Sequence, residues 1–364
     1  MRIVAKVGTS SITDHDGRID DTMIAKVATE VAALRAAGHV VIVVSSGAIS
    51  AGLAPLKLDG RRPTDLPTLQ AIAAVGQHRL MAVWDAAFGC HGLVPGQLLL
   101  SPLDFIDRQQ YLHARQTLER LVELGVVPVV NENDAVADDE IRFGDNDRLA
   151  ALVAHSCGAD LLVLLTDTPG LLTADPRLAE GADLIEEVLE IDAELERVAT
   201  GGGSERGSGG MASKLAAAKI AAWSGVRVVI AAAAREHVLA DAAAGVAGVG
   251  TVVRPRDRRL SARKLWIAFA LRSSGTIVVD AGARTALVER GRSLLPAGVV
   301  GVTGGFDAGD AVEIATGDGV VFAKGLARHP AALVTAWAGR QTADLPVEAD
   351  REVVHRDDLV VLPT

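Results

Sequence analysis

The chain has 364 residues, 49% of them hydrophobic and 23% charged, and its formal net charge is −10 at pH 7. This composition excludes a largely disordered chain and predicts a soluble globular protein of about two or three domains. The negative charge argues against general binding to nucleic-acid phosphates, which depends on clustered Lys and Arg, so we expect no nucleic-acid partner.

The cysteines and the apolar runs indicate the compartment. Cys90 and Cys157, the two cysteines, lie far apart in helical patterns, which favours a reducing compartment over a disulfide framework. The sequence opens on a predicted strand without a signal-peptide pattern, and no apolar run is long enough to span a bilayer. We therefore expect a cytoplasmic protein with no membrane association.

Apolar runs alternate with helical patterns along the first half of the chain. In chain order, the predicted elements are strand 3–7, helix 22–37, strand 40–45, helix 69–88, strand 94–100, helix 110–124, strand 126–130 and strand 161–165. Continuous apolar strands joined by helices indicate an α/β fold with a mostly parallel sheet covered on both faces.

Polar segments follow three of these strands. They are Ser-Ser-Gly-Ala-Ile at residues 45–49, Asn-Glu-Asn-Asp at 131–134 and Thr-Asp at 166–167. Ligands of such sheets bind beyond the carboxyl ends of the strands, so we expect the three segments to contribute to one site.

Two lysines stand in glycine-rich surroundings. Lys6 lies near the end of the first predicted strand, just before Gly8, and Lys214 opens a predicted helix after the Gly-Ser-Gly-Gly-Met-Ala-Ser segment at 207–213. Glycines let backbone N–H groups approach an anion, and lysine adds a point charge for phosphoryl oxygens. Neither segment fits the G-x-x-x-x-G-K-[ST] pattern, so the sequence predicts a phosphate site other than a P-loop.

Acidic and amide residues gather at 131–134 and in the Gly-Asp-Asn-Asp segment at 144–147. Carboxylates accept hydrogen bonds from an ammonium group, amides serve carboxyl groups, and an aspartate can orient lysines or hold magnesium through water. This mixture suits a zwitterionic amino acid. The alternative is that Asp145 or Asp147 merely caps a helix beginning near Arg148.

Other polar segments also allow a purely structural interpretation. Ser46 and the helix after it could bind an anion or simply form an N-cap, and residues 166–176 could form a hairpin or a nucleotide lid. The nine histidines are dispersed. We therefore expect neither a Ser/His/Asp acyl-transfer site nor metal ligation by His.

The pattern changes in the last third of the chain. Residues 200–210 are rich in Gly and Ser and predict a mobile loop, and residues 254–263 form a basic connection. Beyond them, short β-type runs at 276–279, 299–302, 311–314 and 320–324 alternate with glycines. This spacing predicts a small β-rich domain such as a barrel.

Seven segments occur in the order found in the glutamate 5-kinases of the amino acid kinase family, and the chain resembles that family. They are Val4-Ala-Lys-Val-Gly-Thr-Ser, Val44-Ser-Ser-Gly-Ala-Ile, Ala74-Val-Gly-Gln, Val127-Pro-Val-Val-Asn-Glu-Asn-Asp-Ala-Val, Phe143-Gly-Asp-Asn-Asp, Leu164-Leu-Thr-Asp with Gly170-Leu and Thr173-Ala-Asp-Pro, and Gly209-Gly-Met-Ala-Ser-Lys. The tail resembles a PUA domain through Gly275-Thr-Ile-Val-Val-Asp-Ala-Gly-Ala, Arg290-Gly-Arg-Ser-Leu-Leu-Pro-Ala-Gly and His355-Arg-Asp-Asp.

The resemblance implies an amino acid kinase-type three-layer sandwich with a mainly parallel central sheet at residues 1–260, a connection at 261–273 and a PUA barrel at 274–364. The implied reaction is ATP-dependent phosphorylation of the side-chain carboxylate of L-glutamate to L-glutamyl 5-phosphate, the first step of proline biosynthesis. ATP and Mg²⁺ are the implied cofactors, proline a feedback inhibitor, and a homo-oligomer the expected assembly.

The resemblance also implies a role for each matching residue. Lys6 and Lys214 would contact the transferring phosphate, and Asp147 would organise the two lysines or the metal, whose ligands it leaves unassigned. The residues implied to bind ATP are Lys6, Thr166, Asp167, Ser208, Gly209, Gly210, Met211, Ala212, Ser213 and Lys214. Those implied to bind or adjoin glutamate are Ser46, Asn131, Asp134, Asp145 and Asn146.

The chain departs from the family at two positions of the ATP site. The family often has threonine where Ser208 stands and tyrosine where Leu172 stands. Ser208 keeps a hydroxyl, and the phosphate-facing glycines remain, so both changes are compatible with ATP binding but leave its affinity open.

Two other functions compete with this interpretation. Related kinases act on aspartate, N-acetylglutamate, UMP or carbamate, and PUA domains also occur in RNA-binding proteins. Residues 275–364 hold 8 Lys and Arg against 12 Asp and Glu, a local charge of −4, which argues against an RNA surface there.

Overall fold

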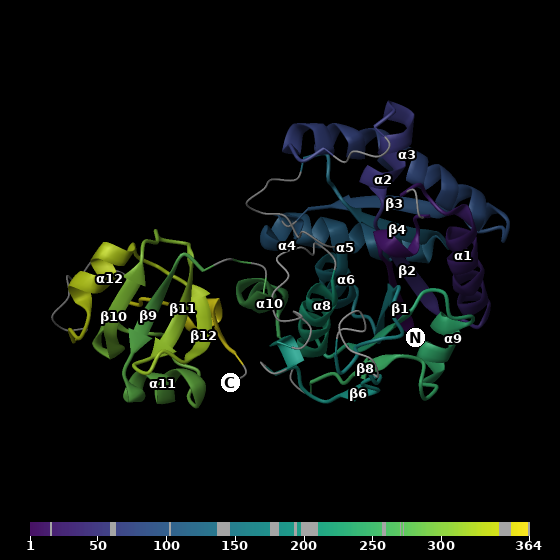
Figure 1. The fold of residues 1–364 in the computed structure, drawn as a ribbon. Coiled ribbons are helices and arrows are strands. Elements are labelled where there is room, and N and C mark those ends of the chain that lie inside the picture. Colours follow the sequence, from purple (N-terminus) through teal and green to yellow (C-terminus); the bar gives the residue numbers. More distant parts are fainter. Residues whose placement is uncertain are drawn as a thin grey trace. The chain divides into compact units, whose positions relative to one another are not determined.

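The computed structural model describes residues 1–14, 17–58, 63–101, 103–136, 146–174, 182–192, 195–197, 210–256, 260–269, 271, 273–341 and 351–362. The chain divides into two compact units, Met1–Arg259 and Leu260–Thr364 (Figure 1).

The described part of the first unit is built on an eight-stranded sheet with the order β3-β4-β2-β1-β5-β7-β8-β6. The strands are β1 (Arg2–Val7), β2 (Val40–Ser45), β3 (Pro95–Leu100), β4 (Val127–Glu132), β5 (Leu161–Thr166), β6 (Glu187–Val188), β7 (Arg227–Ala232) and β8 (Thr251–Val253). The first six strands in the sheet order pair in parallel, and β8 pairs antiparallel to β7. The mainly parallel sheet predicted from the sequence is confirmed.

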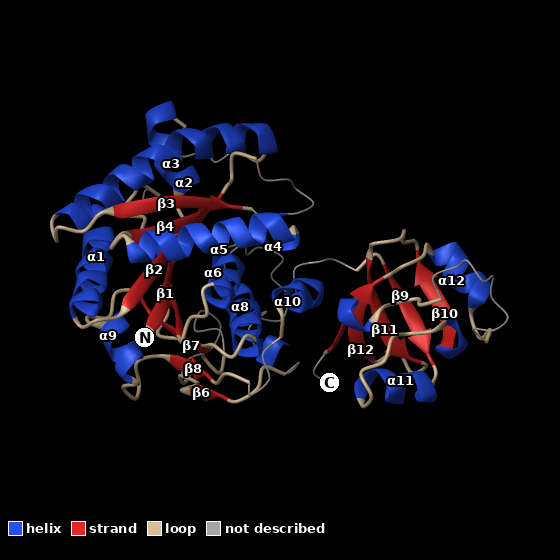
Figure 2. Ribbon diagram, turned by 180° about the vertical axis from the view of Figure 1, so that it is seen from behind, coloured by secondary structure: helices blue, strands red, loops and turns tan. Residues whose placement is uncertain are grey.

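Helices cover both faces of this sheet (Figure 2). They are α1 (Asp21–Ala36), α2 (Ala48–Leu53), α3 (Leu66–Gly89), α4 (Leu103–Ile106), α5 (Arg108–Glu123), α6 (Asn146–Ser156), α8 (Met211–Trp223) and α9 (Val238–Ala244), with short 3₁₀ turns at Thr9–Ser11 and Ala54–Leu56. The helices α1, α3 and α9 share one apolar core with the strands. On the opposite face, α6 packs on β1, β2, β4 and β5, and α5 packs on β3 and β4.

Strand alternation decides which face each side chain meets. Ile3, Ala5 and Val7 of β1 point into the core shared with α1 and α3. Because neighbouring residues in a strand point to opposite faces, Lys6 must point toward the α6 face, where its side chain is only 2% exposed.

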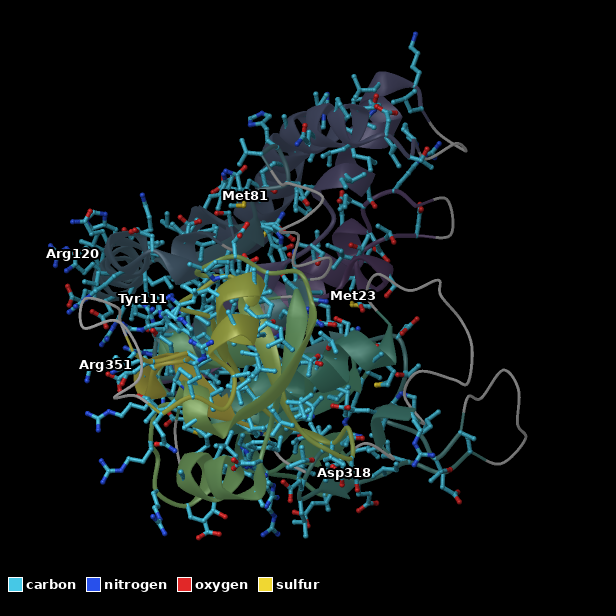
Figure 3. The ribbon with its side chains drawn as sticks, turned by 90° about the vertical axis from the view of Figure 1, so that its left-hand side faces the viewer. Met23, Met81, Tyr111, Arg120, Asp318 and Arg351 are labelled. Carbon is cyan, nitrogen blue, oxygen red and sulfur yellow. The ribbon has the colours of Figure 1, made fainter. Side chains whose placement is uncertain are left out.

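Sequence patterns account for where the long helices begin. Asp20, Asp65 and Asp107 cap α1, α3 and α5 by accepting hydrogen bonds from backbone N–H groups of the first turn. The outer face of α5 is charged. Arg120 extends from it into solvent (Figure 3), and its Nη1 lies 2.8 Å from Oε2 of Glu123. These elements match the predicted helices to within a few residues.

Two boundaries differ from the sequence predictions in a way that matters for the site. Strand β4 continues through Asn131 and Glu132, because these residues pair with Leu99 and Leu100 of β3. Helix α6 begins at Asn146 rather than near Arg148. Asn131 and Asn146 therefore lie on regular elements, not on loops.

The helices α2 and α3 touch through glycines. A Cβ built on Gly76 would lie 1.7 Å from the Ala48 carbonyl oxygen, and one built on Gly52 would lie 2.1 Å from the Ile72 carbonyl oxygen. Such distances leave no room for a side chain, so the two helix backbones are in direct contact. This contact places Ala48, the first residue of α2 and two residues after Ser46, against Gly76 of α3.

The second unit is a small β-rich unit, as the sequence predicted. Its described strands form one sheet with the order β10-β9-β11-β12-β13 and comprise β9 (Gly275–Val279), β10 (Val299–Gly304), β11 (Ala311–Thr316), β12 (Val321–Leu326) and β13 (Leu359–Val361). It also contains α10 (Ala262–Phe269), α11 (Ala281–Val288) and α12 (Ala331–Trp337), with 3₁₀ turns at Pro296–Gly298 and Arg356–Asp358. Its apolar core is separate from that of the first unit, and α10 packs against β12 and β13.

Within the described part of the chain, no helix combines the length and apolar character that a membrane crossing requires.

Replacing Gly76 with alanine is expected to lower the melting temperature by roughly 5–10 °C, because the new methyl group must force α2 away from α3. Gly89→Ala is the matched control on the same helix: apart from its chain neighbours and the nearby backbone of its own helix, no described atom lies within 4 Å of the position that the new Cβ would take, so its melting temperature should stay equal or rise slightly. Differential scanning calorimetry measures both. Equal melting temperatures for the two variants would contradict the close helix contact.

Candidate active site

Lys6 and Lys214 converge on one carboxylate. Lys6 Nζ lies 2.5 Å from Asp147 Oδ1, and Lys214 Nζ lies 3.1 Å from Asp147 Oδ2. The three side chains come from β1, from the first turn of α8 and from the first turn of α6, and α6 packs directly against α8. Residues far apart in the sequence thus form one charged cluster.

This charged cluster is almost fully shielded from solvent. Lys6, Lys214 and Asp147 are 2%, 5% and 0% exposed. Burying charges is costly unless they are paired, and here one aspartate serves two ammonium groups, which gives the cluster a formal charge of +1. Two convergent ammonium groups suit a phosphoryl group, whose negative charge is spread over several oxygens.

Gly8 keeps space beside the charged cluster. A Cβ at this position would lie 3.4 Å from Lys6 Nζ. A larger side chain would therefore occupy the volume next to the ammonium group of Lys6. The glycine-rich setting of Lys6, noted in the sequence, has this spatial consequence.

A second cluster consists of amides and a hydroxyl. Asn146 Nδ2 lies 2.7 Å from the Ser45 carbonyl oxygen, 2.6 Å from Asn131 Oδ1 and 3.0 Å from Ser46 Oγ, so its two N–H groups are shared among these three acceptors. Asn131 Nδ2 in turn donates to Gln77 Oε1 at 2.7 Å. The cluster joins the ends of β2 and β4 to α3 and α6, as expected for segments at the same edge of a parallel sheet.

The hydrogen bonds of this amide cluster leave defined groups for a ligand. The hydroxyl of Ser46 accepts from Asn146, so its proton can be donated elsewhere. The second N–H of Asn131 and the Oδ1 of Asn146 take part in none of these bonds. The cluster therefore offers O–H and N–H donors for a carboxylate and an oxygen acceptor for an ammonium group.

A buried tryptophan anchors the turn that carries Ser46. Trp84 Nε1 donates to Ser45 Oγ at 3.0 Å, and Ser45 Oγ donates to the Ser46 carbonyl oxygen at 3.0 Å. Trp84 is fully buried and stacks on Phe88 with ring centroids 5.5 Å apart. The polar turn is thus fixed to the rigid core of the first unit.

The remaining residues predicted for ATP lie near the charged cluster in the topology. Thr166 ends β5, which pairs with β1 beside Lys6, and its hydroxyl donates to Asp167 Oδ1 at 3.0 Å. Gly210 is the N-cap residue of α8, and Met211, Ala212 and Ser213 form its first turn with Lys214. Ser213 Oγ is buried and has no hydrogen-bond partner among the described residues.

Some predicted residues receive no structural account. Ser208, Gly209 and Asp145 lie outside the described residues, and Asp134 is half-buried just beyond β4. The roles predicted for them, and for Thr166 and Asp167 toward ATP, remain predictions.

The structure bears on three purely structural interpretations: a helix cap for Asp147, an N-cap for Ser46 and a hairpin at 166–176. Asp147 is held by two lysines, so it is more than a helix cap. The N-cap of α2 is Gly47, with a φ of 101°, and it is not Ser46. Leu172 forms a single antiparallel bridge with Leu184, a residue beyond the 166–176 segment for which a hairpin or a lid was predicted.

Sequence reasoning missed Gln77. It appeared within the Ala74-Val-Gly-Gln segment without an assigned role, because the helical pattern of residues 69–88 does not reveal which polar side chain faces the sheet edge. The structure shows that this side chain reaches Asn131.

Among the described residues, no group of three or more His, Cys, Asp and Glu is placed to hold a metal ion. Both oxygens of Asp147 face ammonium groups, Oδ1 that of Lys6 and Oδ2 that of Lys214.

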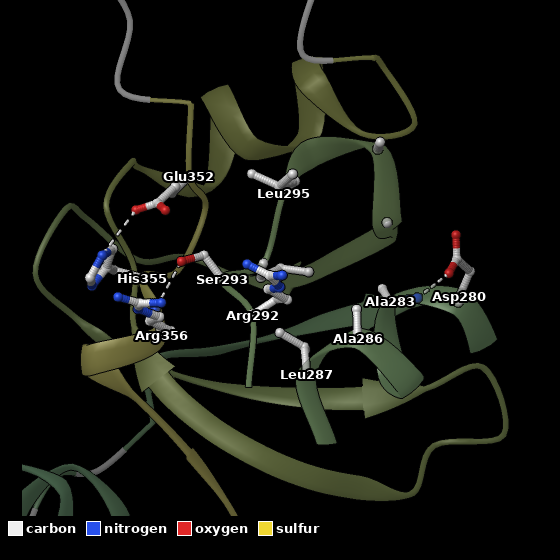
Figure 4. A pocket seen from close by; sticks show the side chains of 14 residues that line it. Asp280, Ala283, Ala286, Leu287, Arg292, Ser293, Leu295, Glu352, His355 and Arg356 are labelled. Carbon is white, nitrogen blue, oxygen red and sulfur yellow. Dashed lines mark hydrogen bonds and ion pairs between the residues drawn. The ribbon is translucent and has the colours of Figure 1, made fainter. Parts of the chain in front are cut away.

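The second unit contains a separate hollow of about 700 Å³ (Figure 4). Leu287 of α11 lines one side of it, and Glu352, His355 and Arg356 line another. Oε2 of Glu352 lies 3.7 Å from Nε2 of His355. No residue that the sequence predicted for catalysis lines this hollow.

Comparison with known proteins agrees with this arrangement. The model of the amino acid kinase family matches residues 1–232, a span that includes both clusters, and a PUA domain model matches residues 275–345. The chain belongs to the amino acid kinase family. The resemblance inferred from the seven sequence segments is confirmed.

Several curated relatives in this family are glutamate 5-kinases. That of Nocardia farcinica is 48% identical over 98% of this chain and 96% of its own, and that of Mycobacterium ulcerans is 48% identical over 99% and 96%. The glutamate 5-kinase of Anaeromyxobacter dehalogenans is 48% identical over 100% and 97%. A solved carbamate kinase from Giardia lamblia bound to AMP-PNP aligns at 16% identity over 70% of this chain and 98% of its own, with a TM-score of 0.49, too distant to bear on substrate.

Replacing Asp147 with asparagine is expected to destabilise this amino acid kinase by about 3–5 kcal/mol, because two buried ammonium groups lose their shared counter-charge. Asp241→Asn, which breaks a partly exposed pair with Arg235, is the control and should cost no more than about 1 kcal/mol. Adding Lys214→Met to Asp147→Asn should restore part of the loss. Thermal melting compares the stabilities of the three variants. A double variant less stable than Asp147→Asn would contradict the argument that the unpaired buried charges cause the loss.

Proposed function

We propose that this protein is a glutamate 5-kinase, which transfers the γ-phosphoryl group of ATP to the side-chain carboxylate of L-glutamate. The curated relatives described above, aligned over nearly the whole chain, support this reaction and substrate. The observation that carries the chemistry is the convergence of Lys6 and Lys214 on Asp147.

The acceptor needs no general base. A side-chain carboxylate with a pKa of about 4.3 is ionised near neutral pH. One of its oxygens forms the new bond to the γ-phosphorus while the bond to the bridging oxygen of ADP breaks, and ADP leaves with that electron pair. Catalysis then depends on alignment of the reactants and on neutralising charge in the transition state.

Lys6 and Lys214 supply that neutralisation in our proposal. Asp147 fixes both ammonium groups before the substrates arrive, so little reorganisation is needed when charge develops on the phosphoryl oxygens. The buried setting strengthens the interaction, because water screens it less. Asp147 itself transfers no proton.

We propose that ATP is bound by the segment before α8 and by the first turn of this helix, together with Thr166 and Asp167. The N-terminal end of α8 directs backbone N–H groups toward bound phosphates, and the unpartnered hydroxyl of Ser213 adds a donor among the described residues. Mg²⁺ would be held mainly by the phosphate oxygens of ATP and by water, as is usual for this ion. Bound there, it would offset phosphate charge.

For glutamate, we propose the amide cluster. The hydroxyl of Ser46 and the free N–H of Asn131 would donate to the α-carboxylate, while Asn146 Oδ1 and the carboxylate of Asp134 would accept from the α-ammonium group. Proline carries the same two groups but lacks an acceptor carboxylate. We therefore propose that proline inhibition, implied by the resemblance, acts by competition at this cluster.

The reaction is tested by incubating the purified full chain with Mg-ATP, L-glutamate and hydroxylamine, which traps an acyl phosphate as a hydroxamate. Aspartate, N-acetylglutamate and UMP are run in parallel with ADP release as the readout. We expect hydroxamate and ADP with glutamate alone. Turnover of another acceptor instead would discard the substrate, and inactivity with all four would overturn the kinase proposal.

Lys214→Ala is expected to lower kcat by at least about 100-fold, because one of the two groups that neutralise transition-state charge is lost. Lys219→Ala lies on the same helix and removes only an ion pair with Glu196, so it is the matched control and should keep near-normal kcat. Steady-state ADP release measures both. An unchanged kcat in a folded Lys214→Ala protein would remove Lys214 from the mechanism.

A further inference from the structure

The Ala74-Val-Gly-Gln segment has no part in the function proposed so far, yet its glutamine reaches the amide cluster. We propose that Gln77 is a positioning residue for the amino acid substrate: it holds the amide of Asn131 in the orientation in which its free N–H faces the ligand. This inference rests on the proposed function, because it concerns the same substrate site.

The orientation of Asn146 is set first, by the backbone. Its amide lies 2.7 Å from the Ser45 carbonyl oxygen, and a carbonyl oxygen can only accept a hydrogen bond. The Nδ2 of Asn146 must therefore face Ser45. The same nitrogen lies 2.6 Å from the side-chain amide of Asn131. Because this nitrogen is a donor, the Asn131 atom that faces it must be the oxygen, which accepts the hydrogen bond.

A second backbone group fixes Asn131 in the same sense. Its Oδ1 also accepts from the N–H of Glu132 at 2.9 Å. With the oxygen turned toward two donors, the Nδ2 of Asn131 must point the other way, toward α3. Asn131 is 1% exposed, so water gives this nitrogen little alternative.

Gln77 completes the sequence of donors and acceptors. It presents Oε1 to Asn131 Nδ2 at 2.7 Å, and its own Nε2 lies 3.4 Å from Oε1 of Gln97 on β3. One N–H of Asn131 is thereby used, and its position determines where the second N–H points. Without an acceptor at residue 77 the amide loses this constraint, and a buried donor is left unsatisfied.

Gly76 allows Gln77 to come within hydrogen-bonding distance of Asn131. Its backbone contact with α2 lets α3 approach the turn that carries Ser46. A helix held farther away would remove Gln77 from hydrogen-bonding distance of Asn131. In the Gly76-Gln77 pair, the glycine sets the separation of the elements, and the glutamine holds the Asn131 amide in the orientation that its other partners select.

The effect should be confined to the amino acid side of the site. The described hydrogen bonds of Gln77 lead to Asn131 and Gln97, on the amino acid side of the site, and neither bond involves Lys6 or Lys214. Gln77→Met, which keeps the volume but removes the acceptor, is expected to raise the KM for glutamate about five- to tenfold. The KM for ATP should change by less than about twofold.

The experiment measures both KM values, kcat and the melting temperature for full-length wild type, Gln77→Met and Gln116→Met. Gln116 is an exposed glutamine on α5 and provides the matched control, which should behave as wild type. Gln77→Asn is the second variant, since it keeps a polar amide but is one methylene too short to reach Asn131. It should raise the KM for glutamate as Gln77→Met does, even if Gln77→Met folds poorly.

A double-mutant cycle tests whether Gln77 acts through Asn131. In an Asn131→Ala background, adding Gln77→Met should change the KM for glutamate by less than about twofold, because the group that Gln77 orients is gone. Full additivity of the two effects would overturn the proposed coupling.

Two failures can be told apart. If the wild type forms no hydroxamate from glutamate, the proposed function fails and this inference fails with it. If the wild type is active but Gln77→Met and Gln77→Asn keep a normal KM for glutamate, or raise both KM values equally, the positioning role alone is wrong.

Discussion

The site of this kinase depends on one buried interaction, the contact of a single carboxylate with two ammonium groups. The carboxylate oxygens of Asp147 lie 2.5 Å from Lys6 Nζ and 3.1 Å from Lys214 Nζ, and all three side chains are nearly inaccessible to water. Two buried lysines without this carboxylate would repel each other at high cost. The packing of α6 on α8 and on β1 therefore brings the three charged side chains together, and the proposed binding of a phosphoryl group depends on it.

The second half of the site is organised by hydrogen bonds between neutral groups. Backbone atoms of Ser45 and Glu132 fix the direction of two asparagine amides, and these amides then present one set of donors and acceptors to the ligand. In the proposed function, the charged cluster binds the phosphoryl group, and the amide cluster together with Asp134 binds the zwitterionic amino acid. This separation fits a reaction whose nucleophile is already ionised and needs alignment more than proton transfer.

Much of the first unit could be predicted from the sequence because its strands are long, continuous and apolar. The predicted strands at 3–7, 40–45 and 161–165 correspond to β1, β2 and β5. Strands β6, β7 and β8 were not predicted: β6 and β8 have only two and three residues, and β7 follows the Ala-rich helix α8 after the short Ser224-Gly225-Val226 turn. The last two residues of β4 are polar, and only pairing with β3 makes them part of a strand.

The sequence alone singled out the residue types that we propose for the chemistry, because glycine-flanked lysines, clustered amides and paired acids stand out from an apolar background. It also indicated that they would gather at one edge of a parallel sheet. Only the tertiary structure decided which atoms meet. The alternation of β1 turns Lys6 toward Asp147, and a glycine contact between α2 and α3 brings Gln77 to Asn131. Such contacts depend on sheet register and helix separation, and neither is encoded in any single segment of the chain.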